Sequence, residues 1–365
     1  MESIPRLVRS LVKSIFEPGI DMTEIAFALD GIRRMLQDFY GKRLRGTADL
    51  ATSACCSSST ASRFRDVLRL IPEEVKQRQY GCGSPIPADD LTGLTVLDLG
   101  SGAGIDAFIA AKLVGPHGRV IGLDMTEEQL QVARRNAPSV AERFGLSNVE
   151  FARDYIETAE SIPDQSVDLA ISNCVINLSP RKDLVFRTIH RILKEGGEFY
   201  VSDIVCDRRL PESIRQNERL YGECLAGAEY FQDLHDVMEG AGFRDVRVVE
   251  KTILDAAVGV EAAKFCSVTL RGFKLALDRR CEDYGQIAVY RGNCQASPVA
   301  FELDEAHLFE ASRPTPVCRN TAWMLSRTRL RRYFEVGPEI KHFGRFDCAP
   351  RTDRAESDSA SGCCS

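Results

Sequence analysis

The sequence predicts an α/β fold, in which a doubly wound, Rossmann-like parallel sheet carries helices on both faces. From about residue 94, apolar strand patterns alternate with helical patterns, and each strand is almost entirely apolar, as in a sheet covered on both sides. The first of these strands runs directly into a glycine-rich turn that opens a helix. An N-terminal helical cap is expected before this sheet, and a small C-terminal α+β domain after it.

The elements of the core follow from apolar runs of strand length and from apolar residues at helical spacing. We expect strands at Thr95–Leu99, Arg119–Asp124, Val149–Ala152, Val167–Ser172, Glu198–Asp203, Val246–Glu250 and Cys266–Phe273. Helices are expected at Phe64–Gln79, Ile105–Val114, Glu127–Phe144, Arg181–Leu193, Pro211–Leu225 and Tyr230–Ala241.

Four segments are predicted from these patterns. Residues 1–60 form a helical cap that gates the site, because Ile25, Leu29, Ile32, Met35 and Leu36 recur at helical spacing. Residues 61–275 form the core domain. Residues 276–350, with short strands interrupted by proline, form a small second domain. Residues 351–365 are polar and aperiodic, and are expected to be a disordered tail.

Composition narrows the class of protein. The chain has 365 residues, 44% of them hydrophobic and 27% charged, and no apolar run approaches the roughly 20 residues of a membrane helix. No secretory signal is evident at the N-terminus. A formal charge of −6 argues against a nucleic-acid binder. We therefore expect a cytoplasmic enzyme, not bound to membranes, that works as a monomer on a small molecule.

The thirteen cysteines point to metal-like or redox chemistry, because a cytoplasmic protein does not keep a disulfide framework. No pair of C-x-x-C motifs occurs, and the five histidines lack zinc-finger spacing. Any site for a soft ion must therefore assemble from distant segments.

The glycine-rich turn, Val96-Leu-Asp-Leu-Gly-Ser-Gly-Ala-Gly104, separates two classes of cofactor. A dinucleotide fingerprint would place its third glycine at position 105, which is isoleucine. Asp98 stands two residues before Gly100, where binders of pyrophosphate keep an apolar residue. The pattern of Asp98, Gly100, Gly102 and Gly104 resembles the first motif of S-adenosylmethionine methyltransferases, whose donor carries no phosphate.

That resemblance implies positions for the rest of the cofactor. Asp124 ends the second strand, where it would accept hydrogen bonds from both ribose hydroxyls, and Met125 would pack on the adenine or serve only as an apolar residue at a helix entry. Asp154, Ile156 and Glu157 follow the third strand, where the family contacts the base. The set is completed by Tyr80 and Asn173. This fold methylates many kinds of acceptor, so the motif is silent on the substrate.

Three cysteines indicate which class of methyl acceptor the protein binds. Cys174 ends a predicted strand whose end faces the reactive methyl group in this fold, and Cys82 and Cys224 lie in Tyr80-Gly-Cys-Gly83 and Tyr221-Gly-Glu-Cys224. Alone, Cys174 would be interpreted as a small buried hydrophobe. The other two, on segments that could fold over the cofactor cleft, favour a thiophilic acceptor.

At these residues the chain resembles the arsenite S-adenosylmethionine methyltransferases, which have a class I methyltransferase sheet. The matching segments are Phe39-Tyr-Gly-Lys-Arg-Leu44, Thr52-Ser-Ala-Cys-Cys56, Tyr80-Gly-Cys-Gly83, Asp98-Leu-Gly-Ser-Gly102, Asp124-Met-Thr126, Tyr155-Ile-Glu157, Ser172-Asn-Cys-Val-Ile-Asn-Leu178, Ser202-Asp203, Tyr221-Gly-Glu-Cys224 and His342-Phe-Gly…Phe346-Asp-Cys348. Asp154 departs from the family, which commonly has glycine there.

The resemblance implies that trivalent arsenic binds Cys82, Cys174 and Cys224, and that arsenite is methylated to methylarsenite and dimethylarsenite in arsenic detoxification. A methylated arsenic needs only two thiolates, so Cys174 and Cys224 are expected to act in both rounds and Cys82 chiefly in the first. The family also implies a fourth cysteine, Cys55 or Cys56, that forms a disulfide during turnover. Glutathione or thioredoxin would then restore the thiols.

Two alternatives stay open at this point. The same fold would serve a methyltransferase of a small organic acceptor, such as a quinone or a phospho-amine, and the cysteines would serve a thiol-based protein that binds metalloids without methylating them. Six further cysteines, Cys206, Cys266, Cys281, Cys294, Cys318 and Cys348, are expected to pack as small hydrophobes.

Overall fold

The computed structural model describes residues 22–44, 46, 49–50, 63–254 and 263–348. The side chains of residues 22–28 are not described, although their helix is. The predicted redox cysteines, Cys55 and Cys56, lie outside the described residues, as does the tail 351–365. Within the described part of the chain, no helix is both long enough and apolar enough to cross a membrane.

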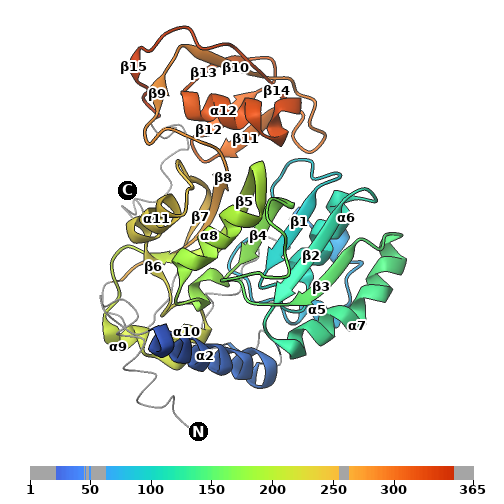
Figure 1. Ribbon diagram of the computed structural model, residues 1–365. Helices are drawn as coiled ribbons and strands as arrows, with labels where there is room; N and C mark the ends of the chain where they lie inside the picture. The colour runs from blue at the N-terminus through green and yellow to red at the C-terminus, as the bar shows by residue number, and fades with distance from the viewer. Residues whose placement is uncertain (1–21, 45, 47–48, 51–62, 255–262, 349–365) are drawn as a thin grey trace.

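The core is an eight-stranded sheet whose main path runs β3-β2-β1-β4-β5-β8-β7, with β6 paired to β5 (Figure 1). The strands are β1 (Thr95–Leu99), β2 (Arg119–Asp124), β3 (Val149–Arg153), β4 (Val167–Asn173), β5 (Leu193–Cys206), β6 (Glu229–Tyr230), β7 (Arg247–Leu254) and β8 (Phe265–Phe273). The pairs from β3 to β5 are parallel, as predicted, whereas β8 is antiparallel to both neighbours.

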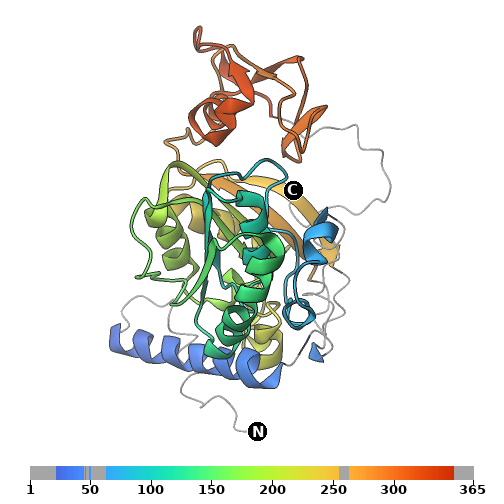
Figure 2. The ribbon, with the colours of Figure 1, turned by 90° about the vertical axis from the view of Figure 1, so that its right-hand side faces the viewer.

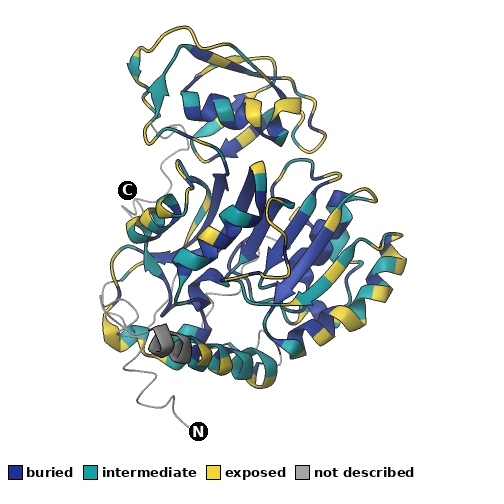
Figure 3. Ribbon diagram, viewed as in Figure 1, coloured by how far each residue is buried: buried dark blue, intermediate teal, exposed yellow. Residues whose placement is uncertain are grey.

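Helices cover both faces of this sheet, which confirms the doubly wound prediction. Alternate residues of each strand point to opposite faces: Leu97 and Leu99 pack in the cluster of α8 (Lys182–Ile192) and α11 (Phe231–Gly240), and Val96 packs with α6 (Ile105–Val114) and α7 (Glu127–Phe144). Figure 3 shows the strands buried between the two helix layers. Burial on both sides explains why the strands are apolar throughout.

Two predicted helices are each divided into two short ones. The 64–79 pattern forms α4 (Arg65–Leu68) and α5 (Glu73–Lys76), because Pro72 cannot continue a helix and starts the next one. The 211–225 pattern forms α9 (Glu212–Arg215) and α10 (Glu218–Gly222), where Asn217 caps the second helix by accepting two backbone N–H groups.

The N-terminal cap is the long helix α2 (Met22–Asp38), continued by one π-helical turn, η1 (Phe39–Arg43). It lies across the carboxyl-terminal end of the sheet, at the bottom of Figures 1 and 2. Ile32 and Leu36 are buried there, four residues apart on one face of the helix. The amphipathic spacing of this segment therefore marks a real docking face.

A small C-terminal unit lies at the opposite end of the sheet from α2, as Figures 1 and 2 agree. It contains β9 (Glu282–Asp283), β10 (Gln286–Tyr290), β11 (Ala300–Asp304), β12 (His307–Glu310), β13 (Pro314–Val317), α12 (Arg319–Arg327), η4 (Arg329–Arg332), β14 (Phe334–Val336) and β15 (Gly344–Arg345). The strands form small antiparallel sheets, β13-β10-β14, β11-β12 and β15-β9, around an apolar cluster of their own. An α+β unit was predicted here.

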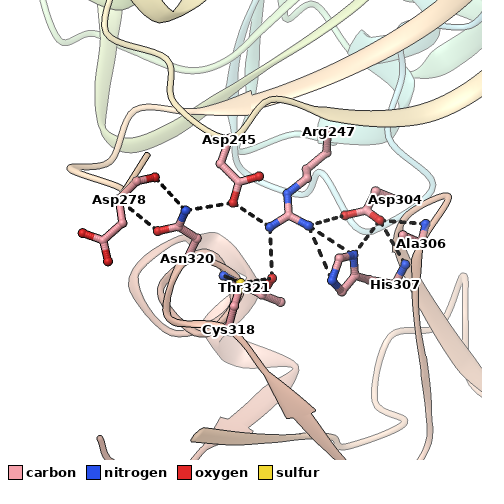
Figure 4. A network of polar contacts seen from close by, with 9 residues as sticks. All are labelled: Asp245, Arg247, Asp278, Asp304, Ala306, His307, Cys318, Asn320 and Thr321. Carbon is pink, nitrogen blue, oxygen red and sulfur yellow. Dashed lines mark hydrogen bonds and ion pairs between the residues drawn. The ribbon is translucent and has the colours of Figure 1, made fainter. Parts of the chain in front are cut away.

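Buried ion pairs attach this unit to the core. Arg247 of β7 donates to Asp245 at 2.7 Å and to Asp304 at 3.3 Å, and also reaches Thr321 of α12 (Figure 4). A second network joins Glu198 of β5 to Arg271 of β8 and to Arg329 of η4. The two networks fix how the C-terminal unit sits on the sheet.

Candidate active site

A cavity opens at the carboxyl ends of β1, β2 and β4, beneath α2. Its empty space is about 1010 Å³ when the open mouth is counted. Ligands of open α/β sheets bind at this end. Of the residues predicted to bind a cofactor, the lining includes Tyr80, Asp98, Gly100, Gly102, Asp124, Met125, Ile156, Glu157 and Asn173.

The glycine-rich loop between β1 and α6 forms one wall of this cavity. Gly102 has a φ of +52°, and a Cβ placed on it would meet nothing within 4 Å, so the space over this residue is open. Gly104 is absent from the lining. Its φ of +92° and the Phe151 ring, 2.7 Å from where a Cβ would stand, require glycine for packing at the start of α6. The third glycine therefore shapes the loop and does not face the cavity.

Two buried carboxylates face the cavity together. Asp98 and Asp106 are 2% and 5% exposed, and one oxygen of each, Oδ2 and Oδ1 respectively, has no hydrogen-bond partner among the described residues. Burial raises the pKa of Asp106 to about 6. Burial and the neighbouring Asp106 also raise the pKa of Asp98 well above its ordinary value. Acceptors left unpaired in this way fit a positively charged ligand.

Asp106 was not among the predicted site residues. It lies in the first turn of α6, directly after the glycine-rich loop, where an acidic side chain is ordinary for any helix. The one signal in the sequence that could have indicated Asp106 is its place directly after a loop expected at the edge of the sheet. Its position beside Asp98 depends on the fold of the loop.

Asp124 both lines the cavity and holds the loop in place. Its Oδ2 accepts from the backbone N–H of Gly102 at 2.9 Å, and its Oδ1 accepts from the N–H of Thr126 at 2.7 Å. Burial nevertheless raises its pKa. Each carboxylate oxygen has a second lone pair, so these bonds leave Asp124 able to accept the ribose hydroxyls that the sequence predicts for it.

Helix α2 closes the cavity from the N-terminal side. Its Ile32, Arg33 and Leu36 belong to the lining. The Arg33 guanidinium donates to Glu157 Oε2 at 3.2 Å and lies 3.9 Å from the centre of the Tyr155 ring. These residues were missed from the sequence, because nothing in an amphipathic helix says which strand ends it will cover.

Glu157 has partners on both of its carboxylate oxygens. Ser179 donates to Oε1 at 2.7 Å, and Arg33 reaches Oε2. The Gln37 side chain donates to the carbonyl of Met125 at 3.0 Å, which attaches the helix to the opposite rim. Both rims of the cavity are thus tied to α2.

Asn173 joins the cofactor loop to the first cysteine. Its Oδ1 accepts from the backbone N–H of Cys82 at 3.1 Å, and its Nδ2 donates to Gly83 O at 3.0 Å and to Asp106 Oδ2 at 2.9 Å. A side chain at Gly81 would collide with it. The end of β4 therefore holds the loop that carries Cys82 against the cavity.

The three predicted arsenic ligands lie together. Cys82, Cys174 and Cys224 are 4%, 2% and 0% exposed and belong to one apolar cluster with Ile32 and Leu36 of α2. Cys174 lines the cavity. The Cys224 thiol donates to the carbonyl of Cys174 at 2.8 Å. Chain segments almost 150 residues apart in sequence therefore meet at one point beside the cofactor cavity.

Two of these cysteines are bonded to each other. Cys82 and Cys174 are joined in a disulfide, with their Cα atoms 5.9 Å apart, an ordinary separation for such a bond. The disulfide with Cys55 or Cys56 that the resemblance implies during turnover involves residues outside the described ones and stays a prediction. Asn173 holds the Cys82 loop close to Cys174, because its Oδ1 accepts from the N–H of Cys82. In this oxidised form two of the three predicted ligands are bound to each other.

The backbone of this site is unusual. Cys174 and Cys224 have φ values of 55° and 63°, in the left-handed region that few residues other than glycine adopt. Such conformations concentrate where a side chain must be aimed at a fixed point. The carboxylate of Asp203 also comes within 4.8 Å of the sulfurs of Cys82 and Cys174, and burial raises its pKa to about 6. Asp203 belongs to a segment that matches the family in sequence, but it was not among the predicted site residues.

Comparison with known proteins gives three concordant results. Residues 90–242 match the family model of a methyltransferase domain. The arsenite methyltransferases of Aquipseudomonas alcaligenes and Homo sapiens are 46% and 34% identical, over 90% and 91% of this chain and 99% and 96% of their own. The crystal structure of an arsenic(III) S-adenosylmethionine methyltransferase from Chlamydomonas reinhardtii has a TM-score of 0.75 at 42% identity, covering 78% of this chain and 99% of that one.

Proposed function

The chain belongs to the family of arsenite methyltransferases, and we propose that its Cys82, Cys174 and Cys224 hold the trivalent arsenic that is methylated. The activity is that of an S-adenosylmethionine-dependent arsenite methyltransferase. The position of Cys174 carries the assignment of the ligands. Cys174 lines the cofactor cavity, and Cys82 and Cys224 pack beside it. Trivalent arsenic is a soft ion, and thiolates are soft ligands.

The cavity fits the cofactor in charge and in shape. When bound, S-adenosylmethionine supplies a methyl group on a positively charged sulfur. The unpaired oxygens of Asp98 and Asp106 face a cation, and the open space over Gly102 admits an adenosyl group without phosphates. Asp124 would accept hydrogen bonds from the ribose, and Met125 and Ile156, which also line the cavity, would pack on the base. Helix α2 keeps water away, which strengthens these charge interactions.

Positioning is the main catalytic contribution of the chain. Arsenic held by three thiolates carries a lone pair on its open side, and that pair bears no proton, so no general base is required. The cysteine backbone in the left-handed region aims the sulfurs, and Asn173 holds the Cys82 loop in register with Asp106. Correct placement of two reactants contributes as much as about 7 to 11 kcal/mol.

The electrons must also balance. Transfer of a methyl cation to the lone pair converts trivalent arsenic to the pentavalent state, and two electrons restore it. Two cysteine thiolates supply them by leaving the arsenic as a disulfide, which glutathione or thioredoxin then reduces. The short distance between Cys82 and Cys174, whose Cα atoms are 5.9 Å apart, supports this role for the pair. In the cycle that the family implies, Cys55 or Cys56 would replace one of these two cysteines in the disulfide. A reducing cytoplasm suits such a cycle.

Replacing Cys82 by serine should separate the two rounds of methylation. Arsenite needs three thiolates, whereas methylarsenite needs two, which Cys174 and Cys224 still provide. We expect the rate on arsenite to fall at least about 10-fold more than the rate on methylarsenite, measured by chromatography of arsenic species with a chemical thiol as reductant. Equal losses on both substrates would contradict the division of roles.

Helix α2 should contribute to cofactor affinity through Arg33. Arg33→Ala removes the bond to Glu157 and the contact with Tyr155, so we expect the Kd for S-adenosylmethionine to rise about 10-fold, or about 1.4 kcal/mol. Calorimetric titration measures it. Arg34→Ala, one residue along on the exposed side of the helix, is the matched control and should bind like the wild type. Equal Kd values for the two variants would refute the role of Arg33.

Cofactor binding should depend on pH through Asp106. The pKa of this carboxyl group is about 6, so it is ionised above that pH and neutral below it. A cationic ligand prefers the ionised form, and affinity should therefore rise as the pH rises through this pKa. Between pH 7.5 and 5.5 we expect several-fold weakening in the wild type. Asp106→Asn should bind weakly at both values, and a wild-type Kd independent of pH would contradict this account.

The activity is tested by incubating the protein with arsenite, S-adenosylmethionine and a thiol, then separating arsenic species. Methylarsenic and dimethylarsenic products are expected. Arsenic bound without methylated products would indicate a metalloid-binding protein, and methyl transfer to a quinone or phospho-amine alone would indicate an organic acceptor.

A further inference from the structure

Three cysteines of the C-terminal unit also meet in space, although they were expected only to fill volume. The sulfur atoms of Cys281, Cys318 and Cys348 all lie within 4.8 Å of one another. Cys318 is buried and the other two are half-buried. None of them is joined in a disulfide. Convergence from three separate segments is the arrangement of a ligand site rather than of ordinary packing.

The local fold holds the three side chains in place. Cys281 directly precedes β9 and Cys348 follows β15, and these strands pair with each other, Gly344 opposite Asp283. The N–H of Phe346 donates to the carbonyl of Cys281 at 2.8 Å, so the two ends stay together. Cys318 is the N-cap residue of α12 and accepts from the N–H of Thr321 at 3.4 Å.

The charges around the cluster favour a thiolate at Cys318. The start of α12 presents a partial positive charge to Cys318. Arg247 donates to Thr321 Oγ1 at 3.1 Å, and that hydroxyl lies 3.2 Å from the Cys318 sulfur, as Figure 4 shows. The pKa of Cys318 lies well below its ordinary value, because the thiols of Cys281 and Cys348 donate to it. The same contacts among the three thiols raise the pKa of Cys281 and of Cys348.

The number of donors selects the ion. Among the described residues, no histidine or carboxylate joins the three sulfurs in this cluster. Structural zinc is almost always held by four protein ligands. Trivalent arsenic needs three, and three thiolates cancel its charge, so the cluster is complete for arsenic as it stands.

We propose that Cys281, Cys318 and Cys348 form a second site for trivalent arsenic, separate from the methylation site. The choice of arsenic as ligand rests on the proposed function, which makes it this protein's substrate. Binding is an exchange without redox change: arsenite loses its three hydroxyl groups as water, each taking one thiol proton, and three As–S bonds replace three As–O bonds.

Arsenic bound there would not be methylated. The C-terminal unit sits at one end of the sheet and α2 at the other, in both Figure 1 and Figure 2. The cofactor cavity is lined by Ile32, Arg33 and Leu36 of α2. The site therefore retains arsenic and links the end of the described chain to α12 and β9. It offers the protein a second binding equivalent that does not compete for the methyl donor.

Arsenic stoichiometry tests the proposal. Full-length protein is reduced with a phosphine under nitrogen, saturated with arsenite and desalted, and arsenic per chain is measured by mass spectrometry. Cys348→Ser should bind about one equivalent less than the wild type. The matched control is Cys294→Ser, a buried thiol of the same unit outside the cluster, which should bind as much as the wild type. Equal arsenic in both variants would overturn the proposal, as would one equivalent of zinc that arsenite does not displace.

A measurement on the unmodified chain guards against a variant that fails to fold. Alkylation of Cys281 and Cys348 in the wild type, followed peptide by peptide, should be slowed at least about 10-fold by arsenite, and unchanged rates would overturn the site. Arsenic lost in Cys348→Ser but no methylated product from the wild type would leave this site standing and overturn the proposed function instead.

Discussion

Cys224→Ser should lower the rate of arsenite methylation by at least about 100-fold, because misplacing one reactant costs that much. Serine has nearly the shape of cysteine, but its hydroxyl is a hard, weakly acidic ligand that does not replace a thiolate on arsenic. Cys224 is fully buried beside Cys174, so a thiol or water from the solvent cannot replace its sulfur on the arsenic. The loss should appear on methylarsenite as well, since this residue is proposed to act in both rounds.

The control for this variant is Cys206→Ser. Cys206 is also fully buried in the same cluster, and its thiol likewise donates to a backbone carbonyl, that of Arg208, at 2.9 Å. Any cost of burying a hydroxyl in place of a thiol is thus shared by the two variants. Rates are measured at saturating cofactor. If Cys224→Ser and Cys206→Ser retained similar activity, Cys224 would not be an arsenic ligand.

Glu198→Gln should destabilise the protein by roughly 3 kcal/mol or more, the usual effect of removing one partner from a buried ion pair. Glu198 and Arg271 are each 1% exposed, and their Oε2 and Nε atoms are 2.7 Å apart. Arg329 of η4 reaches the other carboxylate oxygen. Neutral glutamine would leave two buried guanidinium groups with less compensating charge, at the seam between the sheet and the C-terminal unit.

The midpoint of urea unfolding measures this loss. Asp66→Asn removes an exposed ion pair with Arg69 and serves as control, with an expected change below about 0.5 kcal/mol. Although burial alone would raise the pKa of Glu198, Arg271 and Arg329 lower it. Its stabilisation is therefore present above the ordinary glutamate pKa of about 4.3 and lost as the pH falls below it. A difference from wild type that grows with acid would contradict this account.

Local pattern predicted the core well. The bounds of β1, α6, β2 and α7 agree with those expected from the sequence, because apolar runs between glycine turns leave few alternatives in a sheet covered on both faces. The helical pattern of residues 64–79 gave a wrong prediction of one continuous helix, because Pro72 interrupts it. Local pattern also could not indicate that β8 runs antiparallel, since direction depends on the connection and not on the strand's own residues.

The site was predictable only in part. Motif residues such as Asp98, Gly102 and Cys174 carry their chemistry in local spacing, and all three line the cavity. Arg33 and Asp106 do not, because their role arises from the docking of α2 and from the course of the loop. The same limit explains the cluster in the C-terminal unit: its three cysteines are separated by 30 residues or more, and only the fold brings their sulfurs together.

A single-turnover experiment tests the central claim most directly. Reduced protein and arsenite at equal concentrations are mixed with S-adenosylmethionine that carries a deuterated methyl group. The arsenic species are then separated and identified by their mass in a mass spectrometer. The account predicts arsenic bearing the deuterated methyl group from the wild type and from Cys206→Ser, and none from Cys174→Ser. Only inorganic arsenic from the wild type, or labelled product formed equally fast by Cys174→Ser, would contradict the claim that thiolate-bound arsenic accepts the methyl group.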